Sequence, residues 1–219
     1  MAQSLEDLYY NFLDAARVNG AKDIGIEVIN RYLAMANYDL FNEIWGREKD
    51  SIGYATTENS ENSLKPLVKN ASIAVAGNMA TLPTDYFHTI ALLNYTGSVF
   101  AEIDRITFDE LQYRMLNPIT KPSSTYPIAI YYPTYIQFYP ISTITDVVLF
   151  YIKKPTQPII VLTADATTGV DIYSASSTAP DWSEEHYKDL LRYMVSYLKL
   201  GIGDMQSAEY LDAKIKSER

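Results

Sequence analysis

Cysteine is absent from the 219-residue sequence, and histidine occurs only twice, as His88 and His186. Without cysteine the chain cannot form a disulfide framework, a thiolate zinc site, an iron–sulfur cluster or a cysteine nucleophile. The two histidines fall on different predicted elements, His88 on a strand and His186 on a helix. We therefore expect both to have structural roles, and we expect no metal and no other cofactor.

Long apolar runs and basic clusters are also missing. No apolar run approaches the length of about 18 residues that crosses a bilayer, and the N-terminus lacks the charged-then-apolar pattern of a signal peptide. We therefore expect a protein that is made in the cytoplasm and does not contact a membrane. The formal net charge is −9, and the longest basic cluster is the pair Lys153-Lys154. Proteins that bind phosphates carry a basic patch, so specific binding of nucleic acid is not expected.

The sequence patterns of common enzyme classes do not occur either. There is no phosphate-binding Gly-x-x-x-x-Gly-Lys loop and no Gly-x-Ser-x-Gly nucleophile elbow. Gly201-Ile202-Gly203 lacks the third glycine of a dinucleotide site and follows a predicted helix. Asp109 and Glu110 are adjacent on a predicted helix, so they cannot face each other as a glycosidase pair. These absences favour a protein that is not an enzyme.

Apolar residues at helical spacing predict helices at both ends of the chain. Ser4 and Asp7 form a capping-box pattern at the start of a helix that ends near Asn19, and a second helix is predicted over 23–45. Residues 46–63 are polar without periodicity, which predicts a loop or a mobile arm. Two more helices are predicted over 181–200, with Asp181 as the cap, and over 204–217.

Short β-branched and aromatic segments fill the middle of the chain. Strands are predicted over 72–76, 87–93, 99–103, 128–132, 135–139 and 147–152, and weaker ones over 159–163 and 170–173. Thr107 and Glu110 form a second capping box, which begins one short helix. The order of elements predicts an α+β fold, with N- and C-terminal helices forming a bundle and a mostly antiparallel, Tyr-rich sheet or small sandwich inserted between them.

Three domains follow from this order. Residues 1–63 are the N-terminal helical part with its polar loop, 64–180 form the β-rich domain, and 181–219 are C-terminal helices that pack on the N-terminal helices. Of the nineteen tyrosines, six lie between residues 126 and 151 of the β-rich part. Such a sheet can stack against sugars, or its tyrosines can be half-buried and covered by a neighbouring subunit. The second interpretation is favoured.

Five motifs occur in a fixed order between residues 82 and 155. They are Leu82-Pro83-Thr84-Asp85-Tyr86, Thr107-Phe108-Asp109-Glu110-Leu111, Asn117-Pro118-Ile119-Thr120-Lys121-Pro122, Phe138-Tyr139-Pro140 and Tyr151-Ile152-Lys153-Lys154-Pro155. This succession resembles the head-to-tail ring (adaptor or collar) proteins of tailed bacteriophages, and short-tailed phages of the crAss-like kind in particular. The resemblance extends over residues 80–200.

The resemblance implies a virion structural protein of the neck, at the capsid vertex, that is assembled in the cytoplasm of the host bacterium. It implies a homo-oligomeric, dodecameric ring that binds the portal protein and the adjacent tail or ring proteins. DNA would pass through its channel without specific binding. The alternative function is a Tyr-rich virion module that binds a carbohydrate or a receptor.

Two groups of residues have expected roles in such a ring. The first group would fix turns around the sheet, and comprises Leu82, Pro83, Asp85, Tyr86, Asn117, Pro118, Pro122, Tyr139 and Pro140. The second group comprises acids on the first two predicted helices that would line or approach the channel, namely Glu6, Asp7, Asp14 and Glu27.

Overall fold

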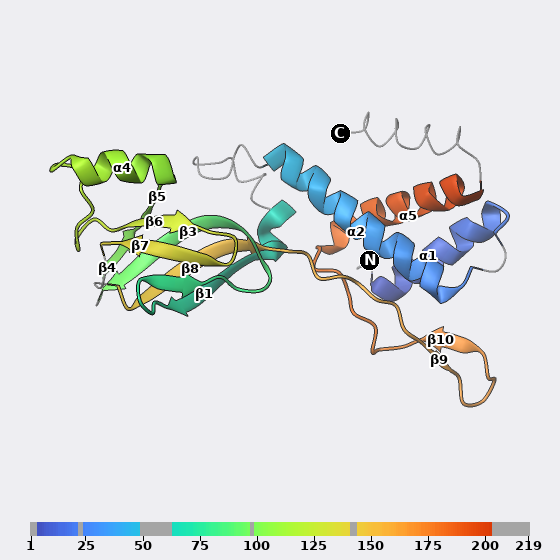
Figure 1. Ribbon diagram of the computed structural model, residues 1–219. Helices are drawn as coiled ribbons and strands as arrows, with labels where there is room; N and C mark the ends of the chain where they lie inside the picture. Colours follow the sequence, from blue (N-terminus) through green and yellow to red (C-terminus); the bar gives the residue numbers. More distant parts are fainter. Residues whose placement is uncertain (1–3, 22–23, 49–62, 97–98, 141–143, 203–219) are drawn as a thin grey trace. The chain divides into compact units, whose positions relative to one another are not determined.

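The chain forms two compact units, which are described separately (Figure 1). The computed structural model describes residues 4–21, 24–48, 63–96, 99–140 and 144–202. The helical unit consists of Met1–Pro66 and Pro155–Arg219, and the β unit consists of Leu67–Lys154. The predicted helix over 204–217 and most of the predicted loop over 46–63 lie outside the described residues.

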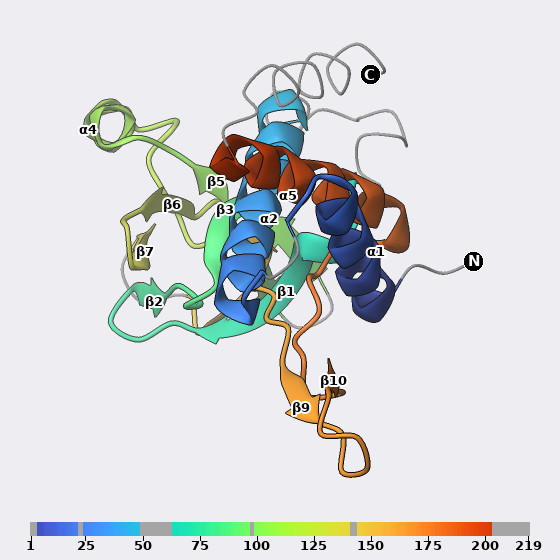
Figure 2. The ribbon, with the colours of Figure 1, turned by 90° about the vertical axis from the view of Figure 1, so that its right-hand side faces the viewer.

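The helical unit is built on α1 (Leu5–Val18), α2 (Ile26–Glu48) and α5 (Tyr187–Ile202). α5 packs against both α1 and α2, so the predicted bundle of N- and C-terminal helices is confirmed (Figure 2). Each helix contributes an apolar stripe to the interior, because apolar residues three and four positions apart share one face. The buried residues include Leu8, Phe12, Leu33, Leu40, Leu190 and Met194.

Local hydrogen bonds define the start of α1 as the sequence predicts. The Ser4 Oγ accepts a hydrogen bond from the backbone N–H of Asp7 at 3.0 Å, and the Asp7 carboxylate accepts one from the backbone N–H of Ser4 at 2.9 Å. The capping box is therefore confirmed. After α1, Gly20 has a φ of 84°, a conformation that glycine adopts at little cost and that ends the helix.

The start of α5 differs from the prediction. The Asp181 carboxylate accepts a hydrogen bond from the backbone N–H of Thr156 at 2.7 Å, and the N-cap of the first helical turn is Ser183 rather than Asp181 as the sequence predicted. A short 3₁₀ helix, η2 (Glu184–His186), precedes α5, and the side chain of Ser183 at its start makes no capping hydrogen bond. The predicted helix therefore begins at Tyr187 as an α-helix.

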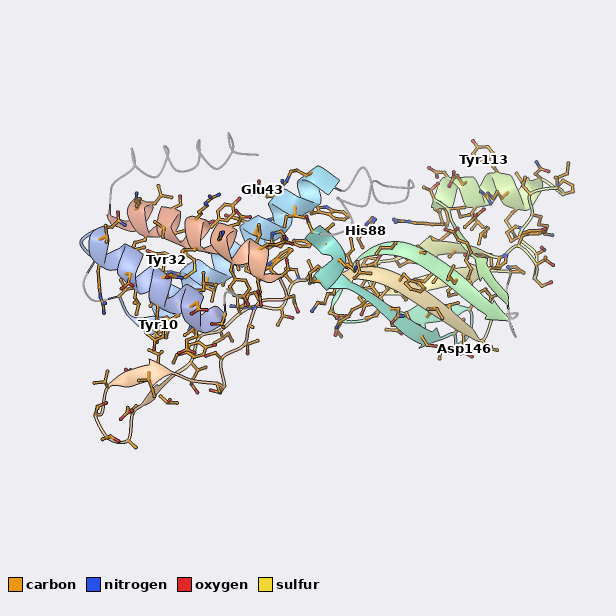
Figure 3. All side chains as sticks on the ribbon, turned by 180° about the vertical axis from the view of Figure 1, so that it is seen from behind. Tyr10, Tyr32, Glu43, His88, Tyr113 and Asp146 are labelled. Atoms are coloured by element: carbon orange, nitrogen blue, oxygen red, sulfur yellow. The ribbon has the colours of Figure 1, made fainter. Side chains whose placement is uncertain are left out.

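Hydrogen bonds also hold α5 and the segment before it against α2. Tyr193 and Tyr197 of α5 donate from their hydroxyls to Glu43 and Asp39 of α2 (Figure 3 labels Glu43). The Tyr32 ring of α2 stacks on the Tyr197 ring with centroids 6.2 Å apart. The contact between α2 and α5 thus includes aromatic and polar side chains as well as aliphatic ones.

Two asparagines of α2 anchor the segment that leads to α5. Asn30 donates to the carbonyl of Ile160 at 2.9 Å and accepts from its N–H at 2.8 Å. Asn37 lies seven residues further along the same face, donates to the carbonyl of Thr156 and accepts from the buried indole N–H of Trp182 at 2.7 Å. These bonds satisfy backbone groups that would otherwise be buried without partners.

Residues 155–180, which the sequence groups with the strands, belong to the helical unit. They include the antiparallel pair β9 (Leu162–Ala164) and β10 (Asp171–Tyr173). β10 falls within the weak prediction over 170–173, β9 overlaps the one over 159–163 and ends one residue later, and most side chains of both strands are exposed.

The β unit contains two four-stranded sheets. The first has the order β1 (Val68–Ala74), β8 (Asp146–Lys153), β3 (Tyr86–Thr96) and β4 (Val99–Glu102), all antiparallel. The second has the order β2 (Met79–Thr81), β7 (Tyr135–Tyr139), β6 (Ile128–Tyr131) and β5 (Asp104–Arg105), in which only β5 and β6 are parallel. The predicted α+β class with mostly antiparallel strands is confirmed.

Both sheets contribute to one apolar core. The buried residues include Leu92, Val147 and Leu149 of the first sheet, and Ala129, Ile136 and Phe138 of the second. Successive strand residues point to opposite faces, so the neighbours of Leu92, Val147 and Leu149 along β3 and β8 face away from this core.

The helix α4 (Phe108–Leu116) lies between β5 and β6 in the chain (Figure 1). Its predicted capping box is present, with the Thr107 hydroxyl and the Glu110 carboxylate each accepting a hydrogen bond from the other residue's backbone N–H. Within α4, all of which the structure describes, only Leu111 is buried. It packs in a small apolar cluster with Ile106, Ile128 and Ile130. Ahead of β1, a single 3₁₀ turn, η1 (Lys65–Leu67), connects the two units.

Candidate interaction surfaces

The described part of the chain shows no arrangement typical of a metal centre. Among these residues there is no group of three or more His, Asp or Glu that could hold a metal ion. None of the described helices combines the length and apolar character needed to cross a membrane. His88, labelled in Figure 3, is half-buried on β3, where burial and then the positive charge of Arg105 lower its pKa below the ordinary value and favour the neutral ring.

His186 lies in an open depression of the helical unit with a volume of about 770 Å³. Its Nδ1 is 3.9 Å from the Asp189 carboxylate, and its ring meets the Trp182 ring edge-on. The Nε2 atom is buried without a hydrogen-bond partner among the described residues, and the Ser183 hydroxyl donates to Glu185. An activated serine must lie within about 3.2 Å of its base. No described serine lies within hydrogen-bond distance of the His186 Nε2 atom. The depression is lined by Ser63, Lys65, Pro66, Ser183, Glu185, His186 and Asp189.

Asp85 connects three strands of the first sheet of the β unit. Its carboxylate accepts hydrogen bonds from the Tyr151 hydroxyl of β8 at 2.9 Å and from the Lys69 ammonium of β1 at 2.8 Å. Its backbone carbonyl accepts from the N–H of Lys154 at 2.7 Å. Burial alone would raise the pKa of Asp85, but the hydrogen bonds from Lys69 and Tyr151 outweigh it and lower the pKa below the ordinary value. The carboxylate is therefore ionised in its structural role.

The rest of the Leu82–Tyr86 motif forms the turn that enters β3. The N–H of Tyr86 donates to the carbonyl of Pro83 at 3.0 Å, which closes the turn. Leu82 is buried and donates from its N–H to the carbonyl of Thr134, just before β7. The backbone of this motif is thus bonded to the segment before β7 of the second sheet, and its Asp85 side chain is bonded to β1 and β8 of the first.

The other expected turn residues lie around the second sheet. Asn117 ends α4, and its side-chain oxygen accepts a hydrogen bond from the N–H of Ile119 at 3.0 Å. Pro118 is exposed and Pro122 is buried. Tyr139 ends β7, lies half-buried against the cluster around Leu111, and is joined to Pro140 by a cis peptide bond.

Most tyrosines of the β-rich region are not available as a flat aromatic surface. Of the six between residues 126 and 151, only Tyr126 is exposed. The rings of Tyr132 and Tyr135 stack on each other with centroids 4.6 Å apart, and Tyr151 is buried. The half-buried positions are those expected for tyrosines that complete a pleated surface.

The four acids expected near a channel are exposed on the helical unit. Glu6, Asp7 and Asp14 lie on the side of α1 opposite its buried stripe, and Glu27 lies in the first turn of α2. Asp7 also belongs to the capping box, and Asp14 is 3.4 Å from the Arg17 guanidinium. All four carboxylates are therefore oriented toward solvent in the single chain.

Charge is divided unequally between the two units. Residues 67–154 contain six acidic and six basic residues, so the β unit has no net charge and the whole net charge of −9 resides in the helical unit. A region with this much net charge repels other acidic surfaces, and a neutral region does not. The two units are thus suited to different neighbours.

An exposed apolar surface on α4 was not predicted from the sequence. Phe108, Tyr113, Met115 and Leu116 are 57%, 76%, 46% and 83% exposed, and Ile119 just beyond the helix is 92% exposed (Figure 3 labels Tyr113). We call these five residues the α4 surface. The signal was present in the sequence, because a short helix with apolar residues on several sides cannot bury all of them against one sheet. Exposed apolar patches of this kind are typical of interaction sites.

Comparison with known proteins identifies the family. The family model described as SU10 adaptor protein matches residues 9–215, which include parts of the helical unit and all of the β unit. Among curated proteins, none matches the sequence. The family match covers nearly the whole chain and agrees with the resemblance found from the motifs between residues 82 and 155. The chain therefore belongs to the SU10 adaptor protein family and is a phage adaptor protein.

Proposed function

We propose that this phage adaptor forms a ring-shaped, dodecameric homo-oligomer that joins the portal to the tail and continues the DNA channel. It is assembled in the host cytoplasm and is located in the neck of the virion. The observation that carries the proposal is the family match over residues 9–215, because it includes both compact units rather than one of them. The turn motifs around Asp85 and Asn117 then have a structural role, as anchors for the strands of the β unit.

The distribution of charge supports the channel. DNA repels an acidic surface, so an acidic lining lets it pass without holding it. The helical unit carries all of the net charge, and Glu6, Asp7, Asp14 and Glu27 are exposed on its first two helices. We place these helices at or near the channel.

Native mass spectrometry of the full chain, alone and mixed with the portal protein, tests this proposal. A defined multimer of the chain, formed alone or on the portal, is the expected result, and its mass gives the copy number. A chain that stays monomeric in both conditions would contradict ring formation. The tail protein can replace the portal in the same measurement to test the second connection.

A further inference from the structure

Among the described residues of the β unit, none covers the α4 surface, whose five side chains are 46–92% exposed. Only Leu111 of the helix is buried, whereas Met115, Phe108, Leu116 and Tyr113 are spread over roughly half of the helix circumference, with the exposed side chains of Gln112 and Asp109 between them. Two of the three charged residues of α4 have partners within the unit. Arg114 is 3.2 Å from Asp104, and Glu110 is held in the capping box. The exposed face of α4 is therefore mostly apolar, and Asp109 is the one charged residue of the helix within it.

The α4 surface is large enough to supply more than half of the area that one partner buries in a specific protein–protein interface. A fully buried aromatic side chain removes about 150–250 Å² from water, and a buried aliphatic one removes about 100 Å². When these areas are weighted by the exposed fractions of its five residues, the α4 surface has on the order of 500 Å² of accessible area that a partner can bury. A standard-size interface buries about 800 Å² on each partner.

A second apolar surface lies on the outer face of the first sheet. Leu92, Val147 and Leu149 point into the core and are at most 2% exposed. Their neighbours Leu93, Val148 and Phe150 point the opposite way and are only half-buried. We call these three residues the outer sheet face. On the adjacent strand β1, the same face carries Val68, which is 40% exposed, and the small exposed side chains of Asn70, Ser72 and Ala74.

The composition of the outer sheet face indicates that another element covers it. An antiparallel sheet with one face in solvent normally alternates apolar and polar residues along each strand, but β8 is apolar on both faces. A sheet face of this kind is typically covered by a helix or by a second sheet. The small residues of β1 leave room for a helix to approach from that side.

We propose that the α4 surface of one copy of this chain packs on the outer sheet face of a second copy. Both surfaces belong to the β unit, which has no net charge, so identical copies can approach there without the repulsion that the helical unit, at −9, would produce. The two surfaces differ, so the contact is heterologous, and a repeated heterologous contact closes a ring when its rotation allows. This inference rests on the proposed ring and identifies its subunit contact.

Two full-length variants test whether the α4 surface mediates self-association. Leu116→Glu places a charge in the α4 surface, and Val18→Glu places the same charge at an equally exposed site on α1, at 87% exposure against 83% for Leu116. We expect Leu116→Glu to weaken self-association at least tenfold in sedimentation velocity, whereas Val18→Glu assembles like the wild type. Equal assembly of wild type and Leu116→Glu would overturn the inference while leaving the ring itself intact.

Photo-crosslinking directly identifies the protein segment that contacts the α4 surface, even if Leu116→Glu fails to fold. The photoreactive p-benzoylphenylalanine replaces Tyr113, or Val18 as the control, in ¹⁵N-labelled chains that are mixed with unlabelled chains. We expect crosslinks from position 113 to β3 or β8 of the unlabelled copy, and no such crosslinks from position 18. Crosslinks from position 113 only to the helical unit, or only to added portal protein, would overturn the proposed contact. If the wild-type chain does not self-associate with or without portal, the proposed ring itself is wrong.

Discussion

The Tyr151 hydroxyl donates a 2.9 Å hydrogen bond to the carboxylate of Asp85, which is 66 residues away in the sequence. The same carboxylate binds Lys69, so one side chain from the turn before β3 holds β8 and β1 together. Because the carboxylate is partly buried and hydrogen-bonded to both an ammonium and a phenol, its replacement leaves two donors without their acceptor. Replacement of this one carboxylate therefore removes contacts to two strands at once.

We expect Asp85→Asn to lower the free energy of unfolding by about 1–2 kcal/mol, because the amide keeps the shape of the side chain but loses the charge that binds Lys69. Asp146→Asn is the matched control, since Asp146 is an exposed acid at the start of β8 (labelled in Figure 3). The control should change stability by less than about 0.5 kcal/mol. Urea unfolding measures both variants, and equal stability of Asp85→Asn and wild type would contradict the role of Asp85.

The contribution of Asp85 should disappear in acid. Its pKa in the folded protein lies below the ordinary value of 3.8, so its stabilisation is complete above that pH and is lost as pH falls through the folded pKa. The stability difference between wild type and Asp85→Asn should be constant at about pH 7 and 5 and shrink below about pH 4. Urea unfolding across this range measures the difference. A difference that grows in acid would show that the carboxylate is not stabilised by its neighbours.

Asn37 should be as important for the helical unit as Asp85 is for the β unit. Asn37 is only 4% exposed and joins the Trp182 indole to the backbone of Thr156. We expect Asn37→Ala to cost about 2 kcal/mol, because the buried indole N–H loses its acceptor. Thermal unfolding followed by Trp fluorescence measures this loss. Asn42→Ala, at an exposed position of the same helix, gains the same helix propensity without losing such a bond. Asn37→Ala should therefore unfold at a clearly lower temperature than Asn42→Ala.

Neutralising the exposed acids of the helical unit tests their proposed place near the channel. The triple variant Glu6→Gln, Asp14→Asn, Glu27→Gln leaves Asp7 in its capping box and should fold with stability close to that of the wild type. Its assembled ring should retain DNA more strongly, and the retention should weaken as salt is raised. Fluorescence anisotropy with duplex DNA measures this affinity.

The matched control for these acids removes the same charge elsewhere. The control variant is Glu102→Gln, Asp146→Asn, Asp171→Asn, all at exposed positions outside α1 and α2. Equal DNA retention by both triple variants would show that only net charge matters, and would contradict a channel lined by α1 and α2.

Features that depend on neighbouring residues in the sequence were predicted well. Both capping boxes, at Ser4 and at Thr107, are present because each needs only residues three positions apart. Long strands such as β7 were predicted because their alternation of buried and half-buried residues repeats over five positions. The strands β2 and β5 contain three and two residues, which is too short for a period to be recognised.

Features that depend on distant partners were not predictable in this way. Asp181 has the residue type and position of a helix cap, but its carboxylate binds the backbone N–H of Thr156, 25 residues away, and the α-helix begins at Tyr187. The segment 155–180 has strand-like composition, yet its backbone is bound by Asn30 and Asn37 of α2. The turn sequence Leu82–Tyr86 was expected to be structural, but nothing local in it shows that Asp85 reaches Lys69 and Tyr151.

The two leucines of α4 provide a direct test of which side of this helix the protein uses for its own core. Leu111 is 8% exposed and packs with Ile106, Ile128 and Ile130, whereas Leu116 is 83% exposed. Leu111→Ala should lower the free energy of unfolding by about 2–3 kcal/mol, because it removes transfer energy and leaves a cavity. Leu116→Ala should stay within about 0.5 kcal/mol of wild type when both are unfolded at a concentration where the chain is monomeric. If Leu116→Ala proved the more costly of the two in the monomer, α4 would use its outer side for the core, and the α4 surface would not be free to bind a second copy.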